Sequence, residues 1–124
     1  MPQELDILMI EDETNIAEAV RFILTREGWR IGLHPEGKGA MQRIRAARPR
    51  LVILDLMLPG RSGAEILAEL RADTDAGLAA TPVLMLTARG QGPAVQPLAE
   101  KADALLAKPF SNDDLRRVVR ELLA

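Results

Sequence analysis

Five short apolar segments, separated by longer stretches with helical periodicity, constrain the fold of this 124-residue chain more than any other feature. Four are clear and the second is weaker; in chain order they are residues 5–10, 29–33, 51–54, 83–86 and 104–107. Segments of this length, bounded by charged residues, glycine or proline, are typical of strands buried on both faces of a parallel sheet. Because parallel strands need crossover connections, the pattern predicts an α/β fold with right-handed crossovers and helices on both faces.

The intervening stretches carry the apolar stripes of amphipathic helices. One stripe consists of Ile16, Ala17, Val20, Ile23 and Leu24, another of Ile66, Leu67 and Leu70, and the last of Leu115, Val118, Val119 and Leu122. Ser111 and Asp114 precede the last stripe at the spacing of a helix-capping box. Strand and helix thus alternate five times, without a repeat, a low-complexity tract or a linker. We therefore interpret residues 1–124 as one domain, a size that can bury a core without disulfides or metals.

Composition excludes several classes of function. The chain has no cysteine, which rules out disulfides, thiolate metal sites and cysteine nucleophiles. Its net charge of -2 and pI of about 5.4 argue against direct binding of nucleic acid through a basic face. No segment approaches the roughly 20 apolar residues of a membrane helix, and the N-terminus lacks the features of a signal peptide. We therefore expect a cytoplasmic protein whose partners are other proteins, without contact with a membrane.

Chemically active side chains stand where the predicted strands end. Glu11 and Asp12 follow the first strand, Asp55 follows the third, Thr87 the fourth and Lys108 the fifth. Taken singly, each has an ordinary explanation as a solvated loop residue, a turn former or a surface charge. Jointly they would converge on one edge of the sheet, where α/β proteins bind their ligands. Crowded carboxylates need a cation, and Mg²⁺ suits oxygen ligands and a phosphate.

With these residues in place, the chain resembles the receiver domains of two-component response regulators over essentially its whole length. Four motifs carry the resemblance: the acidic pair Glu11-Asp12, residues 55–60 followed by Gly63, the segment Leu86-Thr87-Ala88, and the segment Lys108-Pro109-Phe110. The resemblance implies a flavodoxin-like, doubly wound sheet of five parallel strands in the order 2-1-3-4-5. It also implies that the Lys108–Pro109 peptide bond is cis.

The resemblance further implies a phosphorylation-controlled switch. Asp55 would accept a phosphoryl group from a sensor histidine kinase or a histidine phosphotransfer protein. Magnesium would be held by Asp12, Asp55 and the backbone carbonyl of Met57, with Glu11 acting through a water molecule. Such a domain promotes its own phosphorylation and slow dephosphorylation and is not a turnover enzyme.

Two further side chains would connect phosphorylation to a response. By resemblance, Lys108 pairs with the phosphoryl group, and Thr87 moves toward it and shifts the domain between two states. The output would be a separate partner or a C-terminal effector domain, which the sequence does not identify.

The sequence departs from the family pattern in two places that concern this output. Leu105 occupies the position, three residues before Lys108, where the family usually has an aromatic residue. Residues 89–101 contain Gly90, Gly92, Pro93 and Pro97 where a regular fourth helix is expected. A proline inside a helix costs about 3 kcal/mol, so we expect this fourth helix to be irregular and to be the most mobile part of the domain. We expect phosphorylation itself to be unaffected.

Three other features have simpler interpretations. Residues 73–81 form a longer connection than the family norm, which we interpret as a tolerated insertion. The lone His34 has no catalytic or metal-binding set around it, so a loop residue is the better interpretation. Trp29 is most simply an edge of the core.

Two alternative functions remain open beside the switch. One is a Mg²⁺-dependent phosphohydrolase with an aspartyl nucleophile, although haloacid-dehalogenase-like phosphatases have a second aspartate where this chain has Met57. The other is a receiver-shaped interaction module that is never phosphorylated.

Met57 and Arg89 also suggest a hypothesis about the lifetime of the phosphorylated state. They lie two residues past Asp55 and Thr87, where side chains border the approach of a hydrolytic water. Met57 offers no strong hydrogen bond to orient that water, and its flexible thioether can cover the site. We therefore expect the phosphorylated state to outlast that of receivers with polar, water-orienting residues at these positions.

Overall fold

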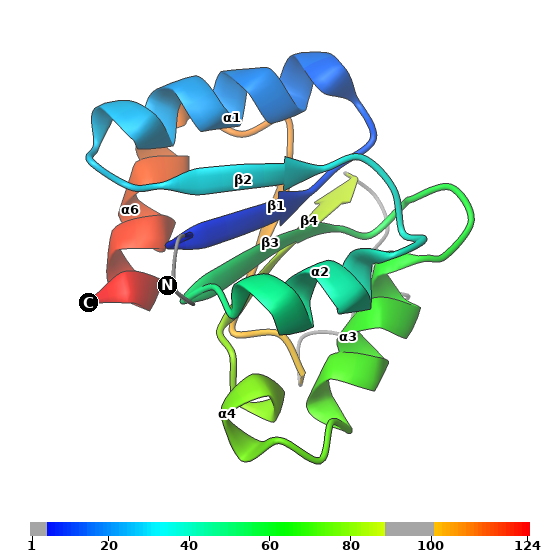
Figure 1. Ribbon diagram of the computed structural model, residues 1–124. Helices are drawn as coiled ribbons and strands as arrows, with labels where there is room; N and C mark the ends of the chain where they lie inside the picture. The colour runs from blue at the N-terminus through cyan, green and yellow to red at the C-terminus, as the bar shows by residue number, and fades with distance from the viewer. Residues whose placement is uncertain (1–4, 89–100) are drawn as a thin grey trace.

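The computed structural model describes residues 5–88 and 101–124, which form one five-stranded parallel sheet flanked by helices (Figure 1). The strands are β1 (Ile7–Ile10), β2 (Ile31–His34), β3 (Leu51–Asp55), β4 (Val83–Ala88) and β5 (Ala104–Lys108). Their order across the sheet is β2-β1-β3-β4-β5, and all neighbouring pairs are parallel. The predicted fold class and strand order are therefore confirmed.

Helices cover both faces of the sheet because successive side chains of each buried strand point to opposite faces. The helices among the described residues are α1 (Thr14–Arg26), α2 (Ala40–Ala47), α3 (Gly63–Arg71), α4 (Ala76–Ala79) and α6 (Asn112–Leu123). One core cluster joins α1 and α6 to alternate strand residues such as Ile7 and Ile53. The other joins α2, α3 and α4 to the residues between them, such as Leu8 and Val52. Among these helices, none is long and apolar enough to cross a membrane.

Side-chain caps fix the first turns of two helices that follow strands of the site. Ser62 and Glu65 form a reciprocal capping box at the start of α3. Ser111 accepts a hydrogen bond of 3.0 Å from the backbone N–H of Asp114 at the start of α6, so the predicted helix start is confirmed. These caps determine where the chain leaves β3 and β5, and therefore where the strand-end side chains lie.

The structure corrects the sequence interpretation of residues 73–81, which were expected to form a loop. They contain the one-turn helix α4, and the side chain of Asp75 accepts hydrogen bonds from the backbone N–H groups of Gly77 and Leu78 in this turn. Leu78 on this turn is buried in the core. A single turn has no hydrophobic period, which is why the pattern did not indicate it.

The first strand is also shorter than the sequence indicated. It begins at Ile7 rather than at residue 5, because the buried Asp6 accepts hydrogen bonds from the backbone and side chain of Arg30. The second strand begins at Ile31, two residues later than expected, and ends at His34, one residue further than expected. Trp29 precedes it and packs against the core, as predicted, with the guanidinium of Arg50 over its ring.

The two departures from the family pattern have different outcomes. Leu105 lies in β5, is partly buried and packs against the core cluster of α2, α3 and α4. The predicted irregular helix falls almost entirely on residues 89–100, outside the described residues, so its irregularity and mobility stay predictions. Arg89 lies outside the described residues as well.

Candidate functional site

The candidate site lies at the carboxyl end of the sheet, where β1 and β3 run side by side. The strand order reverses between these two neighbours, since the chain passes from β1 outward to β2 and returns to β3. Open α/β sheets form a crevice at such a point. Glu11 and Asp12 follow β1 directly, and Asp55 is the last residue of β3. The topology therefore brings together the two acidic motifs that the sequence places 44 residues apart.

Asp55 is held tightly by the connection that follows it. Its side chain is almost fully buried, and its Oδ1 accepts a hydrogen bond of 3.3 Å from the backbone N–H of Met57. Gly63, the first residue of α3, packs directly on its backbone: a Cβ built on Gly63 would lie 2.3 Å from the carbonyl oxygen of Asp55. Only glycine allows this approach, so α3 and the acidic side chain are fixed relative to each other.

Glu11, Asp12 and Asp55, which we term the acidic cluster, can each direct one carboxylate oxygen to a common point. These oxygens lie within 4.8 Å of one another. Glu11 and Asp55 are buried, whereas Asp12 is exposed. The backbone N–H of Glu13 donates a 3.1 Å hydrogen bond to Oε2 of Glu11 and so fixes its orientation. The cluster is thus a preformed set of oxygen ligands with one side open to solvent.

Lys108 supplies the positive charge next to this cluster. Its Nζ lies 3.0 Å from Oε1 of Glu11 and 3.3 Å from Oδ2 of Asp55, and 3.7 Å from Oε1 of Glu13. Burial lowers the pKa of Lys108, but the hydrogen bond to Glu11 and the charges of Asp55 and Glu11 outweigh it, and the net pKa lies above its usual value. Lys108 therefore remains an ammonium.

Glu11 shows the cost of the crowding. Burial raises its pKa to about 7, and the negative charge of Asp55 adds to the effect, while the Glu13 N–H and Lys108 oppose it. Its Oε1 is buried and faces the Lys108 ammonium at 3.0 Å, and no uncharged group among the described residues donates a hydrogen bond to it. The ammonium of Lys108 is shared by the carboxylates of Glu11, Glu13 and Asp55. A buried carboxylate oxygen with no uncharged donor and an excess of negative charge fit a hard divalent cation such as Mg²⁺.

The remaining predicted residues lie at the same edge with fewer contacts. Thr87 is buried in β4, one residue beyond Leu86, which is in register with Asp55. Within the described part of the chain, Thr87 makes no hydrogen bond to the acidic cluster. The Lys108–Pro109 bond is cis, as the resemblance implies. The functional roles of Thr87, Lys108 and the Met57 carbonyl stay predictions.

Sequence reasoning missed Glu13, the N-cap residue of α1. It orients Glu11 through its backbone and adds a carboxylate beside Lys108. The only available signal was its position next to the acidic pair at a helix start.

A mostly apolar pocket of about 530 Å³ also adjoins the site, between α1 and the chain that follows β5, with Glu13 and Lys108 at its rim.

Comparison with known proteins identifies the family. The model of the response regulator receiver domain matches residues 7–120. Response regulator Rre1 of Synechocystis is 36% identical over 126 residues, covering 100% of this chain and 54% of that protein. The DNA-binding response regulator MtrA of Mycobacterium tuberculosis is 36% identical over 118 residues, covering 94% of this chain and 50% of that protein. This chain thus spans about half the length of these relatives.

A solved structure gives the same result in three dimensions. The signal receiver domain of a signal transduction histidine kinase from Syntrophus aciditrophicus superposes with a TM-score of 0.86 at 29% identity. The match covers 96% of this chain and 89% of that one.

Proposed function

This chain belongs to the family of response regulator receiver domains, and on that premise we propose that it is a phosphorylation-controlled switch whose phosphoryl acceptor is Asp55. The observation that carries the proposal is the buried ion-pair arrangement in which one ammonium, Lys108, lies against both Glu11 and Asp55. Such an arrangement of like charges is unfavourable for a structural role alone. It suits a site that receives a cation and a phosphoryl group.

In the proposed reaction, a carboxylate oxygen of Asp55 attacks the phosphorus of a phosphohistidine or of a small acyl phosphate. A new O–P bond forms, the bond to the donor nitrogen or oxygen breaks, and the donor leaves with the electron pair. The Met57 N–H keeps the carboxylate of Asp55 in a fixed orientation for this attack. Burial of Asp55 limits the access of competing water.

Two side chains would then recognise the transferred group. Lys108 already lies 3.3 Å from Asp55 and neutralises the charge that the phosphoryl group adds. The Thr87 hydroxyl donates a hydrogen bond to a phosphoryl oxygen, and this bond shifts the equilibrium between two conformations.

Magnesium would be held by Asp12, Asp55 and the Met57 carbonyl, with Glu11 acting through a water molecule. When bound, the ion stabilises the negative charge of the phosphoryl oxygens during transfer. Its double charge also compensates the excess of carboxylates in the acidic cluster.

The phosphodonor in this proposal is a histidine kinase or a histidine phosphotransfer protein. The apolar pocket beside α1 supports this assignment, because a protein seated there would lie next to Lys108. The output is a domain or partner outside this chain. One relative is a DNA-binding response regulator and one solved structure is the receiver domain of a histidine kinase, so membership of the family does not determine the output.

The proposal is tested with acetyl phosphate and intact mass spectrometry. We expect Mg²⁺-dependent addition of a single phosphoryl group, which EDTA abolishes because the carboxylates then lack their cation. Asp55→Asn should remain unlabelled. Asp113→Asn is a matched control, because Asp113 is almost fully exposed on α6, and it should be labelled like the wild type.

The result also separates the alternatives. Equal labelling of Asp55→Asn would contradict the assignment of the acceptor. Continuous release of phosphate with many turnovers would indicate a phosphohydrolase, and absence of labelling in the wild type would indicate an unphosphorylated interaction module.

A further inference from the structure

The connection between β2 and α2 touches the connection between β3 and α3 where Gly37 meets Arg61. A Cβ atom built on Gly37 would lie 2.1 Å from the carbonyl oxygen of Arg61. Because an ordinary carbon–oxygen contact is about 3.3–3.6 Å, any other residue would force the two backbones apart by about 1 Å. Gly37 is not among the glycines with a left-handed backbone, so the contact, and not the conformation, requires glycine.

The β2–α2 connection is braced so that Gly37 stays in place. The ring Nε2 of His34 donates a 2.8 Å hydrogen bond to the carbonyl of Lys38. The backbone N–H of Ala40 donates a 3.1 Å hydrogen bond to the carbonyl of Gly37. The lone histidine of the chain thus stabilises a turn, and that turn presents Gly37 to Arg61.

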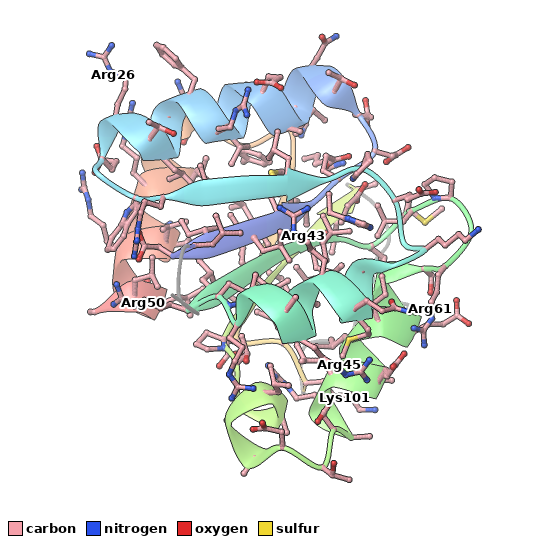
Figure 2. All side chains as sticks on the ribbon, in the orientation of Figure 1. Arg26, Arg43, Arg45, Arg50, Arg61 and Lys101 are labelled. Carbon is pink, nitrogen blue, oxygen red and sulfur yellow. The ribbon has the colours of Figure 1, made fainter. Side chains whose placement is uncertain are left out.

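Arg61 is held from its other side by charged groups. Its guanidinium pairs with Glu69 of α3, and Glu69 also accepts a 2.9 Å hydrogen bond from Arg45 of α2. Arg45 and Arg61 both lie along α3 in Figure 2. Arg61 thus contacts the β2–α2 turn through its backbone and is paired with α3 through its side chain.

The β3–α3 connection transmits this placement to the acidic cluster. Its first part is bonded to Asp55 through the Met57 N–H, and it is closed by a 3.0 Å hydrogen bond from the N–H of Gly63 to the carbonyl of Leu56. Because Leu56, Met57 and Gly63 are held by these hydrogen bonds, a shift at Arg61 would act on the backbone between Met57 and Gly63. Figure 1 shows both connections at the same end of the sheet.

We propose that Gly37 is a positioning residue for the phosphoryl-acceptor site. By admitting the Arg61 carbonyl to close contact, it sets the β3–α3 connection so that the Met57 carbonyl stands at the right distance from Asp55 for Mg²⁺. His34 acts in the same direction by fixing the turn. This inference rests on the proposed function, since it takes the Met57 carbonyl to be a magnesium ligand.

The test is the affinity of the unphosphorylated protein for MgCl₂, measured by isothermal titration calorimetry well below the melting temperature. We expect Gly37→Ala to bind Mg²⁺ about tenfold or more weakly, the effect usual for residues that orient metal ligands. Gly77→Ala is the matched control, because a Cβ there meets only the ends of the flexible Arg48 and Asp75 side chains. It should bind like the wild type.

A purely structural role of Gly37 would lower the melting temperature of Gly37→Ala and leave its Mg²⁺ affinity unchanged, and that result overturns the proposal. If Gly37→Ala does not fold, His34→Ala carries the test: it adds no atom to the contact and should weaken Mg²⁺ binding, whereas His34→Gln, which keeps an N–H donor, should restore it. Unchanged affinity in His34→Ala would then overturn the proposal.

Labelling of the wild type with acetyl phosphate separates this inference from the proposed function. A wild type that binds Mg²⁺ with the expected Gly37→Ala effect, but takes up no phosphoryl group, supports the positioning role and contradicts the switch. A wild type that binds no Mg²⁺ overturns both.

Discussion

Met57 occupies an unusual position among the residues of the site, because its backbone and its side chain have opposite environments. Its N–H is bonded to the buried carboxylate of Asp55, while its side chain is 65% exposed. A single exposed apolar side chain is ordinary on a protein surface, so what matters here is its place next to Asp55. Beside a site that is buried on its protein side, such a side chain lies where solvent must enter.

We predict that Met57→Asn shortens the lifetime of the phosphorylated protein. An amide can hydrogen-bond a water and place it in line with the phosphorus, which the thioether cannot do. Positioning of this kind changes a rate by about tenfold, equivalent to about 1.4 kcal/mol in the barrier. The measurement is the first-order decay of phosphorylated wild type and variant at the same pH and Mg²⁺ concentration.

Met57→Leu provides the control for this prediction, because leucine keeps the size and apolar character of methionine. It should decay like the wild type. Decay of Met57→Asn at or below the wild-type rate would contradict the screening role.

At the scale of elements, α4 shows how tertiary contacts stabilise a helix that is too short to form by itself. An isolated helix of four residues is unstable in water. Here Asp75 caps it, Leu78 anchors it in the core, and Arg71 of α3 donates hydrogen bonds to the carbonyls of Ala79 and Thr81 at 3.0 and 2.7 Å. The same guanidinium reaches the start of β5, where it donates to the side chain of Asp103 at 2.8 Å.

We predict that Arg71→Lys destabilises the domain even though the charge is kept. An ammonium has no planar fork and cannot bond these separate acceptors together. Loss of two or more charge-assisted hydrogen bonds should lower the free energy of unfolding by about 1–3 kcal/mol, measured by urea denaturation. Arg117→Lys on the exposed face of α6 changes only surface ion pairs and should stay within about 0.5 kcal/mol of the wild type. Equal effects of the two variants would refute the role of Arg71.

At the scale of the whole molecule, the sequence predicts what depends on periodicity and misses what depends on contacts between loops. The apolar runs indicate the five strands and their class of sheet, and the strand ends indicate Glu11, Asp55 and Lys108. The contact of Gly37 with Arg61 is not visible in any local pattern, since it joins two turns from different crossovers. The apolar segment of residues 5–10 also gives no sign that its one aspartate, Asp6, is buried and paired with arginine side chains.

That aspartate, Asp6, marks the contrast between the two ends of the sheet. At the carboxyl end, carboxylates outnumber their cation. At the amino end, Asp6 accepts a 2.8 Å hydrogen bond from the N–H of Arg30 and faces the guanidinium groups of Arg30 and Arg50. Burial raises the pKa of Asp6, but the backbone and side-chain hydrogen bonds of Arg30 and the two positive charges together hold it below its usual value. We therefore expect the amino end to stabilise the fold and the carboxyl end to serve the chemistry.

The lowered pKa of Asp6 makes the stability of the domain depend on pH. Because the pKa of Asp6 is lower in the folded than in the unfolded chain, its carboxylate contributes stability above the unfolded pKa of about 3.9, and this contribution is lost as the pH falls through the folded pKa. Asp6→Asn should therefore be less stable than the wild type by about 1–3 kcal/mol at pH 7, the range for hydrogen bonds to charged groups. The difference should shrink steadily below about pH 4. Urea denaturation in EDTA between pH 7 and pH 3 measures it without a contribution from bound metal. Asp113→Asn, at a side chain that is 95% exposed, is the control and should follow the wild type at every pH. A difference between wild type and Asp6→Asn that stays constant from pH 7 to pH 3 would show that packing around residue 6, and not its charge, stabilises the amino end of the sheet.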